Sequence, residues 1–315
     1  MPPRIGLGSA PLALAAGLAL AGCGGGEAAP PRPAFDGQAA FELLERQVAF
    51  GPRVPNTAAH DSLLQFLSGY LRERADSVQV HAFEHVAVEG DTLRLANVLA
   101  SFEPQARSRI LLTAHWDTRP VAEKDPDPNR RGDPIPGAND GASGVAVLLQ
   151  VADVIAREPL PEGYGVDLLF LDGEDYGHDP RTFATRTEDM YLGAREFART
   201  HASYRPLFGI LLDLVGDADP LFLQEGYSVD YAPEVVQRVW RAAREIGYEE
   251  YFEERPMGYV TDDHVFLNQA GIRTIDLIDF DYPAWHTHAD TPEQVSARTL
   301  DMVGEVLLEV IYARL

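Results

Sequence analysis

Five separate segments of this chain carry side chains that can bind a metal ion or transfer a proton. Each segment either follows a short apolar run or lies at the start of a helical pattern. The residues are His115 with Asp117, Asp140, the neighbouring pair Glu174 and Asp175, Asp213, and His286. Imidazole nitrogens and carboxylate oxygens are ligands that zinc takes in proteins, and a catalytic zinc keeps one position open for water or substrate. The set therefore indicates a metal-dependent active site.

Several of these residues have a purely structural interpretation when each is considered alone. Asp140 could cap the helix that follows it, Asp213 could be a turn residue, and His115 could be a hydrogen-bonded histidine of the core. The pair Glu174 and Asp175 is harder to explain, because two adjacent acids after a buried strand repel each other unless a cation or a proton is shared. The combination of all five segments is what favours a metal site.

Alternating strands and helices are expected to position these residues. Alternating or continuous apolar stretches predict strands, and apolar residues at helical spacing predict helices. The predicted strands cover about 78–86, 93–101, 110–114, 166–171, 208–214 and 272–278. The first predicted helix is capped by Asp36 and stops at Gly51-Pro52, and the others cover about 57–74, 144–157, 191–200, 233–246, 263–270 and 292–315. This order predicts one α/β domain with a mixed, mainly parallel central sheet and helices on both faces. Functional residues of such folds lie at the carboxyl ends of the strands.

The first residues are predicted to be an export signal rather than part of the fold. Arg4 precedes an apolar stretch at 5–20, which is too short, and too soon followed by glycine and proline, to be a spanning helix. Its end, Leu20-Ala21-Gly22-Cys23, resembles the lipobox of bacterial lipoproteins, in which the cysteine is acylated; an ordinary secretory signal is the alternative. The predicted regions are a lipoprotein signal peptide at 1–22, a flexible tether at 23–34 and a catalytic domain at 35–315.

Composition limits the compartment and the partners. Cys23 is the only cysteine, so an intrachain disulfide is excluded and cysteine-based catalysis is disfavoured. Gly24 stands where inner-membrane lipoproteins often carry aspartate, so we expect an exported lipoprotein of the cell envelope, on the periplasmic face of the outer membrane. The net charge of −23 argues against nucleic acid, since phosphate binding needs clustered Lys and Arg. Membrane contact is expected only through the lipid anchor, and the oligomeric state stays open.

The motifs, in their order along the chain, resemble those of zinc-dependent aminopeptidases with paired metal ions. They are His-x-Asp at 115–117, Gly-Ala-Asn-Asp-Gly-Ala-Ser-Gly at 137–144, Asp-Gly-Glu-Asp at 172–175, and then Asp213 and His286. The resemblance implies the zinc exopeptidase (phosphorylase/hydrolase-like) fold. It implies a first metal site of Asp140, Asp175 and His286, and a second of His115 and Asp213 with Asp140 shared. It also implies that Glu174 is the general base and that Asp117 orients His115.

A narrower resemblance is to the animal-type glutaminyl cyclases and their bacterial relatives. It rests on Gly-Pro-Arg-Val-Pro at 51–55, His-Trp-Asp-Thr-Arg-Pro at 115–120, Leu-Leu-Asp-Leu-Val-Gly at 211–216, Thr-Asp-Asp-His at 261–264 and Trp-His-Thr at 285–287. Those enzymes use one zinc to close the N-terminal glutamine of a peptide or protein into pyroglutamate, with release of ammonia. For this chain the resemblance implies zinc on Asp140, Asp175 and His286, a proton-shuttling carboxylate network of Glu174, Asp213 and Asp262, and pocket walls from Trp285 and Tyr282.

The chain departs from the vertebrate cyclases at three points. Asp175 stands where they carry Glu, a polar stretch at 177–187 replaces the segment with their pocket tryptophan, and their disulfide is absent. These departures concern the substrate pocket more than the metal. A two-zinc aminopeptidase, in which a metal-bound hydroxide attacks the first peptide bond, remains the alternative, and the number of zinc ions stays open. A non-catalytic binding lipoprotein is disfavoured because Glu174 is intact.

The remaining polar features receive plainer interpretations. The Trp-His-Thr match favours His286 over His288 as the ligand, and His264 is expected either to bond within the pocket or to cap a helix. The charged loop at 125–133 is expected to be solvated, with a cation clamp as the less favoured reading. The other histidines, predicted to be surface or structural residues, are His60, His81, His85, His178 and His201.

Overall fold

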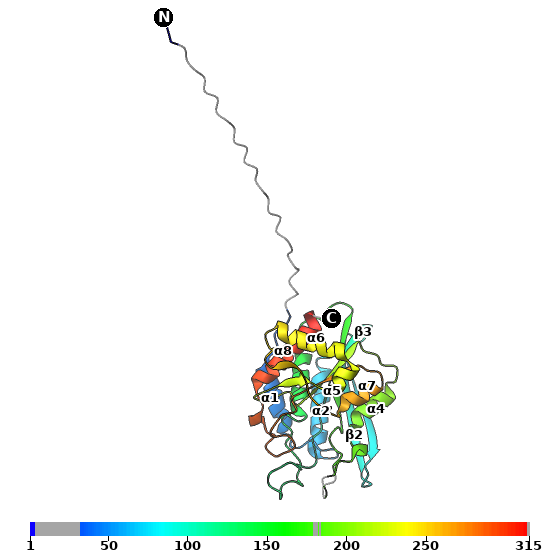
Figure 1. Ribbon diagram of the computed structural model, residues 1–315. Helices are drawn as coiled ribbons and strands as arrows, with labels where there is room; N and C mark the ends of the chain where they lie inside the picture. The colour runs from blue at the N-terminus through cyan, green and yellow to red at the C-terminus, as the bar shows by residue number, and fades with distance from the viewer. Residues whose placement is uncertain (4–31, 179–181, 183, 314–315) are drawn as a thin grey trace. The chain divides into compact units, whose positions relative to one another are not determined.

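The computed structural model describes residues 1–3, 32–178, 182 and 184–313 (Figure 1). The segment Pro31–Leu315 forms one compact unit. Most of the predicted signal peptide, Cys23 and most of the tether lie outside the described residues, so those assignments stay predictions. No helix in the described part of the chain combines the length and the apolar character that a bilayer span requires.

A six-stranded sheet forms the centre of the fold, in the order β1-β2-β4-β3-β5-β8. The neighbours β4, β3, β5 and β8 run parallel, whereas β2 is antiparallel to β4 and β1 is antiparallel to β2. The predicted mixed, mainly parallel sheet is therefore confirmed. The strands are β1 (Ser77–Val86), β2 (Thr92–Phe102), β3 (Ser108–His115), β4 (Tyr164–Leu171), β5 (Phe208–Asp213) and β8 (Thr274–Ile278).

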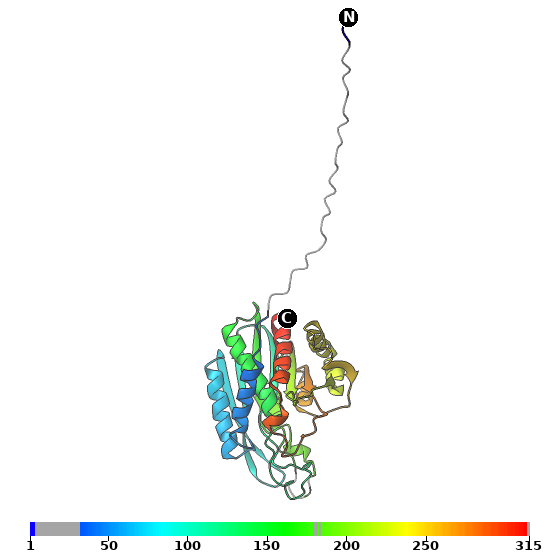
Figure 2. The same ribbon diagram turned by 90° about the vertical axis from the view of Figure 1, so that its left-hand side faces the viewer.

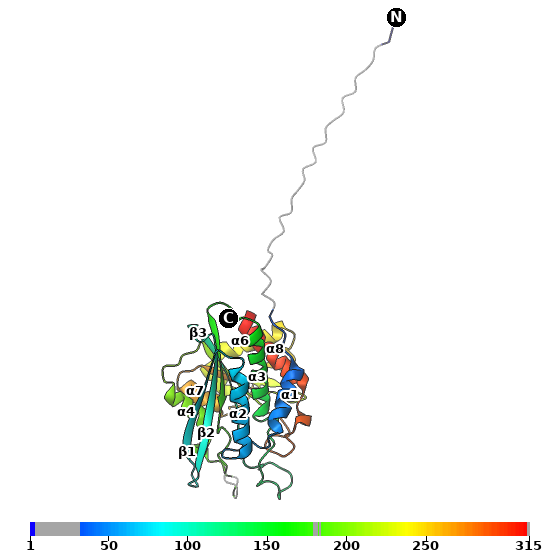
Figure 3. The same cartoon turned by 180° about the vertical axis from the view of Figure 1, so that it is seen from behind.

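Helices cover both faces of the sheet. One face carries α1 (Gly37–Val48), α2 (Ala58–Arg72), α3 (Ala142–Arg157) and α8 (Ala297–Ala313), which lie side by side in Figures 2 and 3. The other face carries α4 (Leu192–Thr200) and α7 (Asp263–Gln269), which pack on each other and on β2, β4 and β5. The helices α5 (Gly226–Tyr231) and α6 (Pro233–Glu245) pack on β8 at the edge of the sheet.

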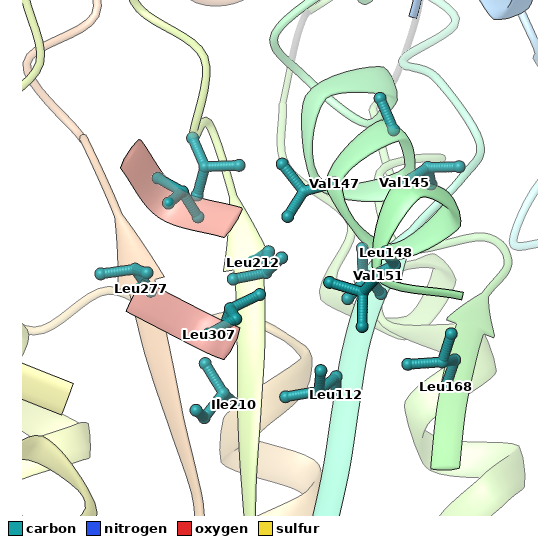
Figure 4. Close-up of a cluster of buried hydrophobic side chains, with 14 of the residues drawn as sticks. Leu112, Val145, Val147, Leu148, Val151, Leu168, Ile210, Leu212, Leu277 and Leu307 are labelled. Carbon is teal, nitrogen blue, oxygen red and sulfur yellow. The ribbon is translucent and has the colours of Figure 1, made fainter. Parts of the chain in front are cut away.

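The central strands are apolar without interruption because both of their faces are buried. Along β3, Leu112 packs into the large core under α3 and α8, whereas Leu111 points to the opposite face and packs with Phe197 of α4. Figure 4 shows the large core, where Leu112 lies near Ile210 of β5 and Val151 of α3. Each such side chain stabilises the fold by about 1.5–3 kcal/mol when it is fully buried.

The structure differs from the sequence prediction where the elements are short. The last helix begins at Ala297 rather than near 292, because Pro292–Gln294 forms a single 3₁₀ turn and Val295 is extended. A small separate parallel pair, β6 (Phe222–Gln224) with β7 (Phe252–Pro256), and α5 were not predicted. Elements of three to six residues are too short to show a periodic pattern.

Candidate active site at the carboxyl edge of the sheet

The ends of the central strands bring the predicted site residues together. β3 ends on His115 and β5 ends on Asp213, while β4 is followed by the turn that carries Glu174 and Asp175. Asp140 lies directly before α3. Since β3, β4, β5 and β8 run parallel, their carboxyl ends share one edge of the sheet.

One cluster consists of Asp140, Asp175 and His286, all buried. His286 Nε2 lies 3.6 Å from Asp140 Oδ2 and 3.8 Å from Asp175 Oδ2. Neither of these two carboxylate oxygens has a hydrogen-bond partner among the described residues. Because unpartnered buried carboxylate oxygens are costly, their convergence on an imidazole nitrogen fits a cation ligand set.

A second cluster consists of His115, Asp140 and Asp213. His115 Nε2 lies 3.4 Å from Asp140 Oδ1 and 3.3 Å from Asp213 Oδ1. Asp140 thus offers Oδ2 to the first cluster and Oδ1 to the second. The side chain of Asp140 does not cap α3, whose N-cap residue is Gly141 and makes no side-chain cap. The capping interpretation of Asp140 is therefore wrong.

Both clusters have dimensions that suit zinc. Ligand atoms about 2.0–2.1 Å from a tetrahedral ion are about 3.4 Å apart, which is close to the distances above. The surroundings of the two histidines differ. Burial lowers the pKa of His286, whereas for His115 the lowering effect of burial is outweighed by Asp117, Asp140 and Asp213, and the pKa is raised well above its usual value. The unpartnered carboxylate oxygens belong to the first cluster, which makes it the better prepared for a cation.

Glu123 holds His286 in the orientation that a ligand needs. His286 Nδ1 lies 2.6 Å from Glu123 Oε1 and donates its proton there, which leaves the lone pair of Nε2 facing the first cluster. Arg119 in turn donates through Nε to Glu123 Oε2 at 2.9 Å and through Nη1 to Asp175 Oδ1. Asp175 therefore uses one oxygen for Arg119 and keeps the other for the cluster.

Asp117 fixes the turn that carries Glu174 and Asp175. Its two carboxylate oxygens accept hydrogen bonds from the backbone N–H groups of Glu174, at 3.1 Å, and Asp175, at 3.2 Å. Asp117 Oδ1 is 3.7 Å from His115 Nδ1, which is too long for a hydrogen bond. The structure thus gives Asp117 a stronger hold on the acidic pair than on His115, which it was predicted to orient.

Two residues of the site have left-handed backbone conformations. His286 has φ 58°, and Leu214, which follows Asp213, has φ 49°. Such conformations are strained for side chains with a Cβ atom and persist only where neighbouring contacts impose them. For His286 those contacts include the hydrogen bond to Glu123. The strain supports a functional reason for the placement of both segments.

A pocket of about 520 Å³ opens over the clusters. Besides the acids of the two clusters, Glu123, Glu174 and Asp262 line it. Burial, and then the charge of Asp262, raises the pKa of Glu174 well above its usual value. Burial, and then the charge of Asp213, raises the pKa of Asp262 to about 7. A carboxyl group with a raised pKa is better able to hold a proton and to donate it during a reaction.

Aromatic side chains form a wall of the pocket. Trp285 lines it, as expected, and is joined by Phe280, with the ring centroids 4.7 Å apart. Tyr282 does not line it. The Tyr282 hydroxyl instead donates to Asp290 Oδ1 at 2.8 Å, and Asp290 accepts the backbone N–H of Asp140 at 3.1 Å. The pocket role predicted for Tyr282 is wrong, because its side chain is buried beneath the Asp140 loop.

The histidine assignments are partly confirmed. His286 faces the clusters, whereas His288 Nδ1 lies 2.8 Å from Asp125 Oδ2. His178 was expected to be a surface or structural residue, but it lines the pocket and contacts Arg119, and burial together with that charge lowers its pKa to about 4. His264 neither caps α7, which Asp262 does, nor lines the pocket.

Two functional-site residues were not assigned a role from the sequence. Glu123 lies in a long polar loop without a motif, and Arg119 belongs to the motif at 115–120 but received no role. The loop at 126–133 is mostly exposed, as expected. Asp125 is instead buried and accepts the backbone N–H of His288 at 3.0 Å. Only the spacing Arg119-x-x-x-Glu123, with an ion pair at four residues, hinted at an ordered segment.

Comparison with known proteins places this geometry in a family. Residues 97–311 match Peptidase family M28. The chain belongs to Peptidase family M28. Two solved structures support the assignment. Bacteroides thetaiotaomicron glutaminyl cyclase bound to N-acetylhistamine is 41% identical, with 90% of this chain and 99% of that chain covered and a TM-score of 0.86. A Zn-dependent exopeptidase from Parabacteroides distasonis is 38% identical, with 90% and 100% covered and a TM-score of 0.86.

A more distant relative of this M28 chain is the glutaminyl-peptide cyclotransferase of Drosophila melanogaster. It is 26% identical over 281 residues, which cover 81% of this chain and 75% of the relative. The family and its solved structures confirm the predicted zinc exopeptidase fold. They include both cyclases and an exopeptidase, so the reaction has to be argued from the pocket.

Proposed function

We propose that this M28 protein is a glutaminyl-peptide cyclotransferase. The α-amine of an N-terminal glutamine would attack the side-chain amide carbon, the bond from that carbon to the amide nitrogen would break, and ammonia would leave. The similarity to two cyclases supports this reaction. The observation that carries the proposal is that Asp262, which belongs to neither pocket cluster, lines the pocket together with Glu174 and Asp213.

Membership of Peptidase family M28 and the similarity to a Zn-dependent exopeptidase imply zinc. The first cluster fits a zinc ion because the unpartnered oxygens of Asp140 and Asp175 are available as ligands. Asp140, Asp175 and His286 would hold the ion. When bound there, zinc supplies a Lewis acid that polarises the substrate carbonyl. We infer one zinc in the pocket, because the Asp140 and Asp175 oxygens near His286 have no hydrogen-bond partner among the described residues, whereas His115 Nε2 already pairs with Asp213 Oδ1 at 3.3 Å.

Glu174 would transfer the proton. Its carboxylate takes a proton from the attacking amine and gives it to the departing nitrogen, which requires a pKa near neutrality, in the direction that burial and Asp262 shift it. Asp213 and Asp262 would hold the neutral amine in place by accepting hydrogen bonds from its N–H groups. The wall of Trp285 and Phe280 would select the folded conformation of the glutamine side chain, in which the reacting atoms are adjacent.

A two-zinc aminopeptidase is the second candidate. The observation in its favour is the His115, Asp140 and Asp213 cluster, whose distances also suit zinc. In that reaction Glu174 would again act as the base, but the substrate would be any suitable N-terminal residue, and Asp262 would have no necessary role.

Product analysis separates the two candidates. The purified protein is incubated with zinc and either a peptide that begins with glutamine or the same peptide with leucine in first position, and the products are identified by mass spectrometry. We expect pyroglutamyl peptide and ammonia from the first and no change in the second. Release of free leucine, with the glutamine peptide not cyclised, would instead establish the aminopeptidase.

A further inference from the structure

A third group of ligand-type side chains lies behind the pocket, between α7 and β8. Asp262, His264 and Asp276 are all buried, and each offers one ligand atom within 4.8 Å of the others. Asp262 is the N-cap residue of α7 and His264 lies in its first turn, while Asp276 lies in the middle of β8. Of the three, only Asp262 also lines the pocket.

The hydrogen bond of His264 leaves one ring nitrogen aimed at the two acids. His264 Nε2 lies 3.1 Å from Glu225 Oε2. Glu225 also accepts the backbone N–H groups of Ser228 and Val260. It is therefore an ionised acceptor, and Nε2 carries the proton. This carboxylate–imidazole pairing is the arrangement that orients metal-bound histidines.

The atoms that face one another in this group have no hydrogen-bond partner among the described residues. They are His264 Nδ1, Asp262 Oδ2, and both carboxylate oxygens of Asp276. His264 Nδ1 and Asp276 Oδ2 are 3.9 Å apart, which is too far for a direct hydrogen bond. Because the ligand atoms of a tetrahedral zinc ion are about 3.4 Å apart, these two atoms would have to approach each other by about 0.5 Å to share one.

Charge gives a second reason for a cation. Asp262 and Asp276 are buried beside Glu225, and no Lys or Arg forms an ion pair with any of the three among the described residues. Two ionised carboxylates in such a place repel each other and lose their hydration. A divalent ion would neutralise both charges, and the imidazole nitrogen would complete its ligand set.

We propose that Asp262, His264 and Asp276 form a buried binding site for a divalent transition-metal cation, distinct from both clusters in the pocket. The single nitrogen ligand favours zinc or a similar ion over calcium or magnesium, which take oxygen ligands. The ion would enter from the pocket past Asp262. Once bound, it would hold Asp262 ionised beneath the substrate amine and leave Glu174 as the acid that carries the proton.

To test this site, the protein is treated with a chelator and reloaded with zinc, and its zinc content is then measured by mass spectrometry. Asp140→Asn removes the carboxylate that both pocket clusters share and leaves two ligands in each, so these clusters should bind zinc weakly, and retained zinc that also depends on Asp276 lies in the third group. We expect about one zinc per chain in Asp140→Asn and none in the double variant with Asp276→Asn. Zinc-free Asp140→Asn protein with a native circular dichroism spectrum would overturn the proposal.

Two further variants keep the test independent of folding defects. Asp263→Asn alters a neighbouring buried acid that is outside the group, so in the Asp140→Asn background it should leave zinc bound; loss of zinc here would contradict the assignment. Glu225→Gln removes the orienting carboxylate of His264 and should weaken zinc binding in that background about 10–100-fold. Unchanged affinity would also contradict it.

Discussion

At the scale of single residues, the side chains at strand ends were predictable and the side chains that hold them were not. His115, Asp213 and the acidic pair at 174–175 follow apolar runs, and parallel strands bring such positions to one edge. Glu123 reaches His286 across a separation of 163 residues, and a loop without periodicity gives no sign of that contact. The role of Tyr282 was predicted wrongly because the sequence does not show which aromatic residue after β8 faces the pocket; in the structure it is Phe280.

Glu174→Gln tests the proton carrier. The amide keeps the size of the side chain but cannot accept a proton from the attacking amine, so the rate of pyroglutamate formation should fall about 10²–10⁴-fold. Zinc content should stay at the wild-type level, because Glu174 belongs to neither pocket cluster. An unchanged rate would refute the assigned role.

Glu123→Ala tests the orienting contact of His286. Without the 2.6 Å partner of Nδ1, the imidazole can turn or change tautomer, and zinc affinity should fall about 10–100-fold. The matched control is Asp127→Ala, which alters an exposed acid of the same loop. Competition with a zinc-binding dye measures both. Equal affinities for the two variants would show that Glu123 does not hold the ligand.

At the scale of elements, length decided what the sequence could predict. The long helices α1 and α2 begin close to the predicted positions; the cap predicted at Asp36 is confirmed, and Thr57 also accepts a backbone hydrogen bond at the start of α2. The short helix α5 was not predicted, although its N-cap residue makes several hydrogen bonds. Its N-cap residue, Glu225, accepts the backbone N–H of Tyr227 at 2.9 Å and of Ser228 at 2.7 Å and binds His264.

The stability of the α5 cap should depend on pH. Burial raises the pKa of Glu225, but His264 and the backbone donors outweigh burial and lower it to about 2, below the ordinary 4.5. A carboxyl group whose pKa is lower in the folded than in the unfolded protein stabilises the fold at pH values above its unfolded-state pKa. That contribution is lost as the pH falls through the folded-state pKa. The contribution is up to about 3 kcal/mol.

Urea unfolding of the zinc-free protein checks this dependence. The free energy of unfolding of the wild type should exceed that of Glu225→Gln at pH 6, and the difference should shrink as pH falls below about 4.5 toward 2. A difference that is constant across this range would mean that the charge of Glu225 does not stabilise α5.

At the scale of the whole molecule, the sequence predicted the α/β class because its long strands and helices alternate clearly. The remaining whole-molecule prediction concerns the N-terminus. We propose that the protein is an exported lipoprotein anchored through Cys23, on the strength of the segment Leu20-Ala21-Gly22-Cys23 that ends the apolar stretch. A tether of small residues and prolines would then separate the anchor from the catalytic unit.

Cys23→Ser tests the anchor. In a bacterial host the wild type should incorporate labelled palmitate and sediment with membranes, whereas the variant should do neither, because the acylated side chain is gone. Glutaminyl-peptide cyclisation by the variant should be unaffected. Palmitate labelling that survives the substitution would place the lipid elsewhere or show an unrelated mode of attachment.

The most direct measurement of the central claim is zinc-edge anomalous diffraction from crystals of the zinc-loaded protein. The claim is that acids and an imidazole from distant segments share one cation at the edge of the sheet. We predict an anomalous peak about 2.0–2.2 Å from Asp140 Oδ2, Asp175 Oδ2 and His286 Nε2. Zinc-loaded crystals without a peak among these three atoms would contradict the account, whichever reaction the enzyme performs.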